Sequence, residues 1–224
     1  MSSSSTPVSL HFDEEAQRYD TWKKRNGFYY ETLKHFHTGN VRQGESVLEL
    51  GCGTGDILGN IEAKRRIGTD ISPGMIAVAK KKYPTMEWYA GVIGTIPLRE
   101  TFDVIILSDV IEHLEDVEGT FRDLKPLCHV GTRVVINMAN PLWEPLLMVL
   151  EKLHMKMPEG PHHRISTKQL TAVLSRHGYI LKKREHRMLF PMDVPLLTRF
   201  TQAIEKLPWM QRLCLIDILH YEVQ

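Results

Sequence analysis

Cysteine is scarce in this chain of 224 residues, which holds Cys52, Cys128 and Cys214 and no others. Their number is odd and their spacing is not that of a zinc finger. The sequence therefore predicts neither a disulfide framework nor a structural zinc site. We expect reduced thiols and a cytoplasmic location.

An excess of charge of one sign is also missing. The 28 Lys and Arg residues nearly balance the 27 Asp and Glu residues, and the formal net charge is +1. Surfaces that bind nucleic acid need a clear positive excess, so no nucleic-acid partner is predicted. The short basic runs 80–82 and 182–184 are interpreted as solvated surface.

Long apolar runs are absent as well. None approaches the roughly 20 residues that a membrane-spanning helix needs, and no charged-then-apolar leader opens the chain. No transmembrane segment is expected, although peripheral contact with a membrane stays open. The serine-rich residues 1–10 are expected to be disordered, and residues 11–224 to form a single domain.

Strand and helix signals alternate along that domain. Helices are expected from Gly55, from Ser72 and over 167–177. The predicted strands are 46–50, 65–69, 86–89, 103–107, 132–138, 179–188 and 213–223. Alternation of this kind predicts the α/β class: a Rossmann-like, doubly wound, seven-stranded and mostly parallel sheet with helices on both faces.

Two segments stand outside the alternation. Residues 12–40 carry large aromatic side chains at helical spacing and are predicted to form two short helices that cap a pocket. Residues 140–165 are longer than a plain crossover and rich in apolar residues, which favours a substrate lid after the fifth strand. An amphipathic helix packed on the core remains the alternative for this stretch, given the periodicity of Leu142, Leu146, Leu150 and Leu153.

A turn with three glycines in five residues follows the first predicted strand, at Gly51-Cys-Gly-Thr-Gly55. Glycine adopts backbone conformations that other residues avoid, and the helix behind the turn offers unpaired N–H donors. The spacing is GxGxG instead of the GxGxxG of dinucleotide-binding folds, which argues against a nicotinamide oxidoreductase. Asp70, after the second strand, is placed to bind ribose hydroxyls, so a nucleoside ligand is predicted.

Three motifs occur in this order: Glu49–Gly55, Gly68–Met75 and Phe102–Leu114. Together they resemble the cofactor-binding motifs of class I S-adenosylmethionine (SAM)-dependent methyltransferases. The resemblance implies SAM as the cofactor, with Asp70 on the ribose, Ile71 and Met75 against the adenine, and Asp109 near the methionine moiety. The full set of cofactor-binding residues that it implies is Glu49, Gly51, Cys52, Gly53, Gly55, Asp70, Ile71, Met75, Ser108 and Asp109.

Residues after the fourth strand are candidates for the chemistry, because open α/β sheets bind ligands beyond the carboxyl ends of their strands. Asp109, Glu112 and His113 share one helical turn, and two carboxylates with an imidazole can hold a divalent metal. This set resembles that of the O-methyltransferases of ubiquinone biosynthesis, which adds His162 as a fourth ligand of Mg, Zn, Fe or Mn. Asp109 stands where those enzymes usually have glutamate.

A metal-free site is the alternative, since many methyltransferases without metal also carry Glu-His-Leu here. In that case His113 or His163 is the candidate general base, because an imidazole titrates near neutral pH. The leading hypothesis is O-methylation of a small, hydrophobic diol, catechol or natural-product-like molecule. The alternatives are a metal-independent N-, C- or carboxyl-methyltransferase acting on a natural product, sugar or lipid-linked intermediate, and a non-catalytic SAM-binding partner subunit.

Overall fold

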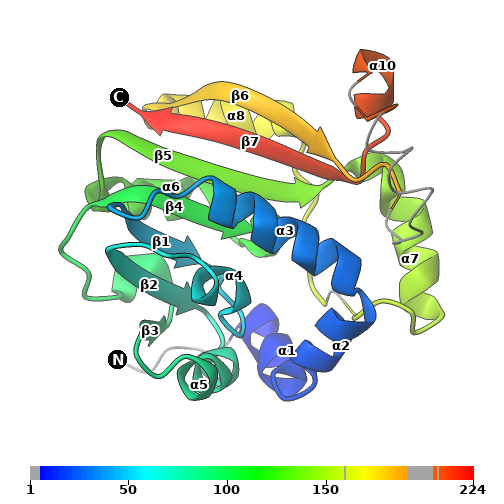
Figure 1. Ribbon diagram of the computed structural model, residues 1–224, viewed down its shortest axis with the longest axis horizontal. Helices are drawn as coiled ribbons and strands as arrows, with labels where there is room; N and C mark the ends of the chain where they lie inside the picture. Colours follow the sequence, from blue (N-terminus) through cyan, green and yellow to red (C-terminus); the bar gives the residue numbers. More distant parts are fainter. Residues whose placement is uncertain (1–5, 159, 191–203, 206) are drawn as a thin grey trace.

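A computed structural model describes residues 6–158, 160–190, 204–205 and 207–224. Its core is one seven-stranded sheet in the order β3-β2-β1-β4-β5-β7-β6 (Figure 1). The first five strands are parallel, and β7 lies antiparallel between β5 and β6. The strands are β1 (Ser46–Leu50), β2 (Arg65–Asp70), β3 (Glu87–Ala90), β4 (Phe102–Ser108), β5 (Cys128–Ala139), β6 (Tyr179–Arg187) and β7 (Ile216–Val223).

Helices cover both faces of the sheet, so its central strands are near-continuous apolar runs. The helices are α1 (Pro7–Glu15), α2 (Tyr19–Arg25), α3 (Gly27–Gly39), α4 (Asp56–Gly59), α5 (Pro73–Lys82), α6 (Val117–Leu124), α7 (Glu144–Lys152), α8 (Thr167–Arg176) and α10 (Pro208–Gln211). One core lies under α3, α4 and α5 and buries Leu33, Leu58 and Ile76. The other lies under α6 and α8 and buries Phe121 and Leu170. This arrangement confirms the predicted Rossmann-like fold.

Local sequence signals set several helix ends. Ser72 caps α5 by accepting a hydrogen bond from the Met75 N–H, and Pro73 fills the first helical position. A capping box of Ser166 and Gln169 starts α8. The helix expected from Gly55 is only the single turn α4. The starts of α4 and α5 fix where the carboxyl ends of β1 and β2 meet the helices that follow them.

The expectation of disorder over residues 1–10 is wrong for residues 7–10, which belong to α1; residues 1–5 lie outside the described part. Thr6 caps α1 by accepting from the Ser9 N–H, and Pro7 starts it. The hydroxyl of Ser9 donates to the carbonyl of Ile71 at 3.3 Å, and Val8 is buried. Contacts with the body of the domain therefore order a segment whose composition alone indicated disorder.

The cap comprises three helices, α1, α2 and α3, where two were predicted, because the chain turns at Asn26 between the last two. Figure 1 shows α1 and α2 beyond the carboxyl ends of β1 and β2, while α3 lies on one face of the sheet. Asp13 accepts from the Ser72 hydroxyl and from the Gly74 N–H, so α1 docks on the start of α5. The cap is thus joined to the domain beside the predicted cofactor site.

The lid segment 140–165 contains α7, but not with the stripe that the sequence indicated. Leu142, Leu146 and Leu153 are 66%, 46% and 62% exposed, whereas Trp143 and Leu147 pack on the core. The leucine periodicity correctly predicted an apolar helix, but it predicted the wrong face of that helix to be buried. The reason is that the short α7 meets the domain at one end. No helix in the described ranges is long and apolar enough to span a membrane.

Asn140 fastens the start of this lid segment. Its amide donates to the carbonyls of Arg212 at 3.0 Å and Cys214 at 2.8 Å, and its oxygen accepts from the Leu142 N–H at 3.1 Å. The first two bonds tie the end of β5 to the chain that enters β7, and the third is local. The segment predicted as a lid therefore starts from a fixed point at the carboxyl end of the sheet.

Candidate functional site

The glycine turn after β1 is held in left-handed backbone conformations. Gly51 has φ +72° and Gly55 has φ +81°. A Cβ on Gly51 would lie 2.2 Å from Val110, and one on Gly55 would lie 2.5 Å from Trp88. Only glycine fits either position, and the turn presents its backbone to the space above the sheet.

Glu49 lies at the floor of that space. Its side chain is 2% exposed overall, and its Oε2 accepts from the Leu58 N–H at 3.1 Å. Burial raises the pKa of this carboxyl from 4.5 to about 8, despite the opposing effect of the nearby Lys23 ammonium. A cationic ligand placed here would favour the ionised form of Glu49.

Asp70 ends β2 and turns its carboxylate toward the glycine turn. It accepts from the backbone N–H groups of Gly53 at 2.8 Å and Ser72 at 2.9 Å. Burial raises its pKa to about 6, and the two hydrogen bonds oppose that rise. These bonds fix the carboxylate beside the turn, in the place where the sequence puts a ribose-binding group.

Asp109 follows β4 with an unusual positive φ of 52°. Its Oδ2 accepts from the Tyr29 hydroxyl at 2.8 Å, and its Oδ1 accepts from the Asn137 amide at 2.9 Å. The oxygen of that amide lies 2.8 Å from Nε2 of His37. Burial raises the pKa of Asp109 to about 6. The carboxylate is therefore oriented by two groups from other elements.

These groups surround a cavity of about 450 Å³ between the glycine turn and the cap helices α2 and α3. Six of the predicted cofactor residues line it: Glu49, Gly51, Cys52, Gly53, Ser108 and Asp109. The cap contributes Tyr19, Lys23 and Tyr30. Four predicted cofactor residues, Gly55, Asp70, Ile71 and Met75, do not line this cavity, and Met75 is 1% exposed within the core.

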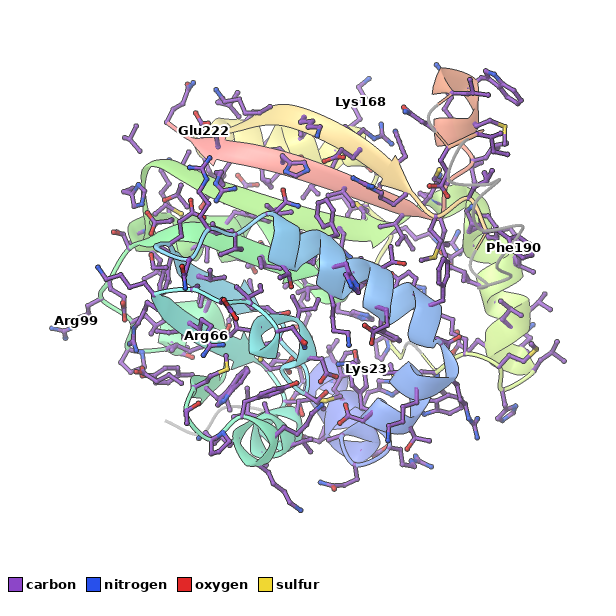
Figure 2. The ribbon with its side chains drawn as sticks, viewed as in Figure 1. Lys23, Arg66, Arg99, Lys168, Phe190 and Glu222 are labelled. Carbon is purple, nitrogen blue, oxygen red and sulfur yellow. The ribbon has the colours of Figure 1, made fainter. Side chains whose placement is uncertain are left out.

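An ion-pair network closes the cap over the cavity. Lys23, labelled in Figure 2, lies 2.9 Å from Asp56, while Lys82 lies 2.6 Å from Asp56 and 2.7 Å from Asp20. Although burial raises the pKa of Asp56, the two ammonium groups lower it to about 2. The network links α2 to the start of α4 and to the end of α5.

His113 and His162 lie close to each other and do not line the cavity. The carbonyl of Pro161 lies 3.2 Å from Nδ1 of His113, and the rings of His113 and His162 meet edge to face at 6.5 Å. Burial lowers the pKa of His113 to about 4, so its ring is neutral at pH 7. Nδ1 then donates to the carbonyl and Nε2 keeps its lone pair. His113 is consequently an oriented, weakly basic imidazole.

Glu112 is the remaining acid of the predicted metal set. Burial and the charge of Asp109 raise its pKa to about 8. Its Oε2 is buried and has no hydrogen-bond partner within the described ranges. A carboxyl group in this environment holds its proton at neutral pH.

The predicted metal ligands do not fit a metal site as the structure arranges them. Asp109 uses both oxygens on Tyr29 and Asn137, and Nε2 of His162 lies 3.6 Å from Glu144. Among the residues that the structure describes, no group of three or more His, Cys, Asp or Glu is positioned to hold a metal ion. The four residues lie in one neighbourhood, but their donor atoms do not converge.

The two candidate bases differ in their surroundings. The side chain of His163 is exposed, and its backbone N–H donates to the carbonyl of Glu112 at 2.6 Å. His113 is partly buried between Phe12 of α1 and the lid segment. The arrangement favours His113 over His163 as the imidazole nearest to the chemistry.

Several site residues were missed by the sequence analysis as functional groups. Tyr29, Lys23 and His37 lie within the predicted cap, residues 12–40, but none of them was predicted as a site residue. Asn137 stands near the end of the fifth predicted strand, so the rule that ligands bind at the carboxyl ends of strands could have found it. The other three come from helices whose docking the sequence pattern does not specify.

The chain is similar in sequence to known methyltransferases. A family model described as a methyltransferase domain matches residues 21–182. A probable SAM-dependent methyltransferase of Mycolicibacterium smegmatis is 34% identical over 113 residues, which cover 47% of this chain and 42% of that protein. A ubiquinone biosynthesis O-methyltransferase of Bradyrhizobium diazoefficiens is 27% identical over 133 residues, covering 55% of this chain and 52% of that one. The chain therefore spans about half of the length of these curated relatives.

A solved structure gives the same fold. The N-methyltransferase NodS of Bradyrhizobium japonicum, in complex with S-adenosyl-L-homocysteine (SAH), superposes with a TM-score of 0.67 at 16% identity. The superposition covers 97% of this chain and 99% of that one. Because the family model matches residues 21–182, which are most of this chain, the chain belongs to the methyltransferase domain family. It has the fold of the class I SAM-dependent methyltransferases.

Proposed function

We propose that the chain binds SAM in the cavity between the glycine turn and the cap, and transfers its methyl group to an oxygen of a small hydrophobic molecule. The observation that carries this proposal is the cavity itself. It joins a close-approach glycine turn to the carboxyl groups of Glu49 and Asp109 under a cap of aromatic side chains.

The charges of the cavity match those of SAM. The cofactor carries a sulfonium and an ammonium group, and the cavity wall holds the carboxyl groups of the buried Glu49 and the half-buried Asp109. Asp70 stands beside the turn as the ribose acceptor. In the reaction the sulfonium loses its charge, so carboxylates near it stabilise the bound cofactor more than the transition state. We therefore assign Glu49 and Asp109 to cofactor binding, and SAH, which lacks the sulfonium charge, should bind more weakly.

The rate enhancement is assigned to orientation. Methyl transfer is an in-line displacement in which the attacking oxygen, the methyl carbon and the sulfur lie on one line. His113 accepts the proton of the attacking hydroxyl at its free Nε2. Because its pKa is lowered to about 4, it is a weak base, which favours acidic hydroxyls such as those of phenols.

A metal is not part of the proposed mechanism, because both oxygens of Asp109 accept hydrogen bonds from protein groups and no group of three or more His, Cys, Asp or Glu among the described residues is positioned to hold a metal ion. An apolar substrate is supported by the lid. Leu142, Val149 and Leu153 are about half or more exposed, and Phe190, labelled in Figure 2 beside α7, is 37% exposed. Exposed apolar surface of this kind, on a segment whose Pro161 carbonyl lies against His113, favours a hydrophobic ligand.

The proposal is tested in two steps. Calorimetry first measures binding of SAM and SAH to the full chain. Methyl transfer from labelled SAM to a panel of phenols, catechols, amines and carboxylic acids is then followed with and without a chelator. We expect SAM binding, transfer to phenolic oxygen that resists the chelator, and loss of transfer in His113→Ala with SAM binding retained.

The matched control is His35→Ala, because His35 is exposed on α3 and its Nδ1 lies at the carbonyl of Glu31 in its own helix. Loss of transfer in the chelator would contradict the metal-free mechanism. Transfer only to amines would contradict the assignment of oxygen, and tight SAM binding with no transfer to any panel member would favour a non-catalytic role.

A further inference from the structure

We propose that His37 is a positioning residue: through Asn137 it fixes the direction of the Asp109 carboxylate at the wall of the cofactor cavity. The inference rests on the proposed function and extends it to a residue that does not line the cavity. His37 is fully buried on α3, on the sheet side of that helix.

One face of α3 supplies both ends of the arrangement. Tyr29, Leu33 and His37 are spaced by four residues and therefore share a face of the helix. Leu33 is 1% exposed and His37 is 0% exposed, so this stripe lies against the sheet. Tyr29 and His37 are about 12 Å apart along the helix axis, which lets one helix reach Asp109 directly and through Asn137.

The hydrogen-bond directions leave one arrangement. Asp109 accepts from the Nδ2 amide hydrogens of Asn137 at 2.9 Å, so the amide oxygen of Asn137 faces away from the carboxylate and toward His37. Nε2 of His37, at 2.8 Å, must then carry the hydrogen and donate it. If the amide turned over, its oxygen would face the carboxylate and its N–H groups would face an N–H donor.

His37 is well suited to act as a donor of fixed direction. Its Nδ1 is buried and has no hydrogen-bond partner in the part of the chain that is described. Burial lowers the pKa of the imidazole to about 4, so the ring is neutral at physiological pH and carries one N–H. Burial of a polar ring in an apolar core costs desolvation free energy. The hydrogen bond from His37 to Asn137 explains why the ring is there.

A packing role makes a different prediction from a positioning role. If His37 only fills space, an apolar ring of similar size preserves SAM binding. If His37 orients Asn137, removal of its N–H leaves the amide free to turn, and Asp109 loses one of its two donors while Tyr29 still holds the other. The cofactor then meets a carboxylate of less defined direction.

The test compares SAM dissociation constants of the full chain by calorimetry, with melting temperatures measured in parallel. His37→Phe keeps the ring shape and should weaken SAM binding by about ten-fold, the effect of one hydrogen bond within a buried network. His37→Gln, whose amide N–H can reach Asn137, should recover most of that loss. His35→Phe makes the same substitution at an exposed position of α3 and should leave SAM binding unchanged. His37→Met replaces the Phe variant should that variant not fold.

A double-mutant comparison identifies Asn137 as the intermediary. In an Asn137→Leu background, His37→Phe should cause no further loss of SAM affinity, because the pathway is already interrupted. Unchanged SAM affinity in His37→Phe or His37→Met would overturn the inference, and so would equal losses in the Phe and Gln variants or additive losses in the double variant. SAM binding and methyl transfer by the wild type would still uphold the proposed function. If the wild type bound no SAM, the proposed function would fail and this inference with it.

Discussion

Glu49 offers the sharpest test of how the cavity is built. Its carboxyl group is buried and keeps a pKa of about 8 in the fold, against an ordinary value of 4.5 in an open chain. Between these two pH values the folded state binds more protons than the unfolded state. The contribution of the protonated carboxyl to the free energy of unfolding is therefore fully present below about pH 4.5, and it is lost as the pH rises through 8.

Glu49→Gln removes this titration and keeps the shape of the side chain. Taking about 1.4 kcal/mol per pKa unit, the free energy of unfolding of the wild type should fall by roughly 3 kcal/mol relative to the variant between pH 5 and pH 8. Urea unfolding of both cofactor-free proteins at the two pH values measures this difference, because other titrating groups cancel. A difference that does not change with pH would refute the assignment of a protonated Glu49.

SAM gives the same residue a second readout. A cation beside Glu49 favours its ionised form, so binding at pH 7 should release up to about one proton from the wild type. Calorimetry in two buffers with different ionisation enthalpies measures the released proton. Glu49→Gln should release fewer protons and bind SAM more weakly. Equal proton release by the two proteins would contradict the placement of the cofactor's positive charge beside this side chain.

Three further substitutions test other parts of the site. Gly55→Ala forces a side chain against Trp88 at φ +81° and should lower the free energy of unfolding by roughly 2–4 kcal/mol in urea, whereas Gly27→Ala, in open space, should not. Asp70→Asn turns one amide N–H toward a backbone donor and should weaken SAM binding about ten-fold by calorimetry; unchanged affinity would exclude Asp70 from the ribose site. Asn140→Ala should lower the free energy of unfolding by roughly 1–3 kcal/mol and speed proteolysis of α7. Equal cleavage rates in the variant and the wild type would contradict the anchoring role of Asn140.

The sequence predicted the parts of the fold that depend on local pattern. Strands flanked by glycine, proline or a capping serine were placed within a few residues, since period and turn chemistry are local properties. Asp70 lies against the glycine turn, because strand order in an α/β sheet brings the carboxyl ends of β1 and β2 together. The same rule pointed to Asp109, whereas Glu49 and Ser108 came from the resemblance to SAM-dependent methyltransferases.

Other parts depend on tertiary contacts that no pattern specifies. Residues 7–10 form a helix because Ser9 and Asp13 meet the start of α5, far along the chain. Tyr29 and His37 reach the site because α3 docks one particular face on the sheet. The proposed metal set depended on spacing along one helical turn, but residues 111–113 form a 3-10 turn, and the Asp109 backbone adopts a positive φ instead of continuing a helix.

The position of β7 has a consequence for synthesis of the chain on the ribosome. Among the described strands β6 pairs only with β7, which occupies residues 216–223 and lies between β5 and β6. While translation proceeds, the nascent β6 therefore exposes unpaired backbone donors and acceptors until the later strand emerges. Its many charged residues, Lys182, Lys183 and Arg184 among them, keep that temporary edge from pairing with other nascent chains.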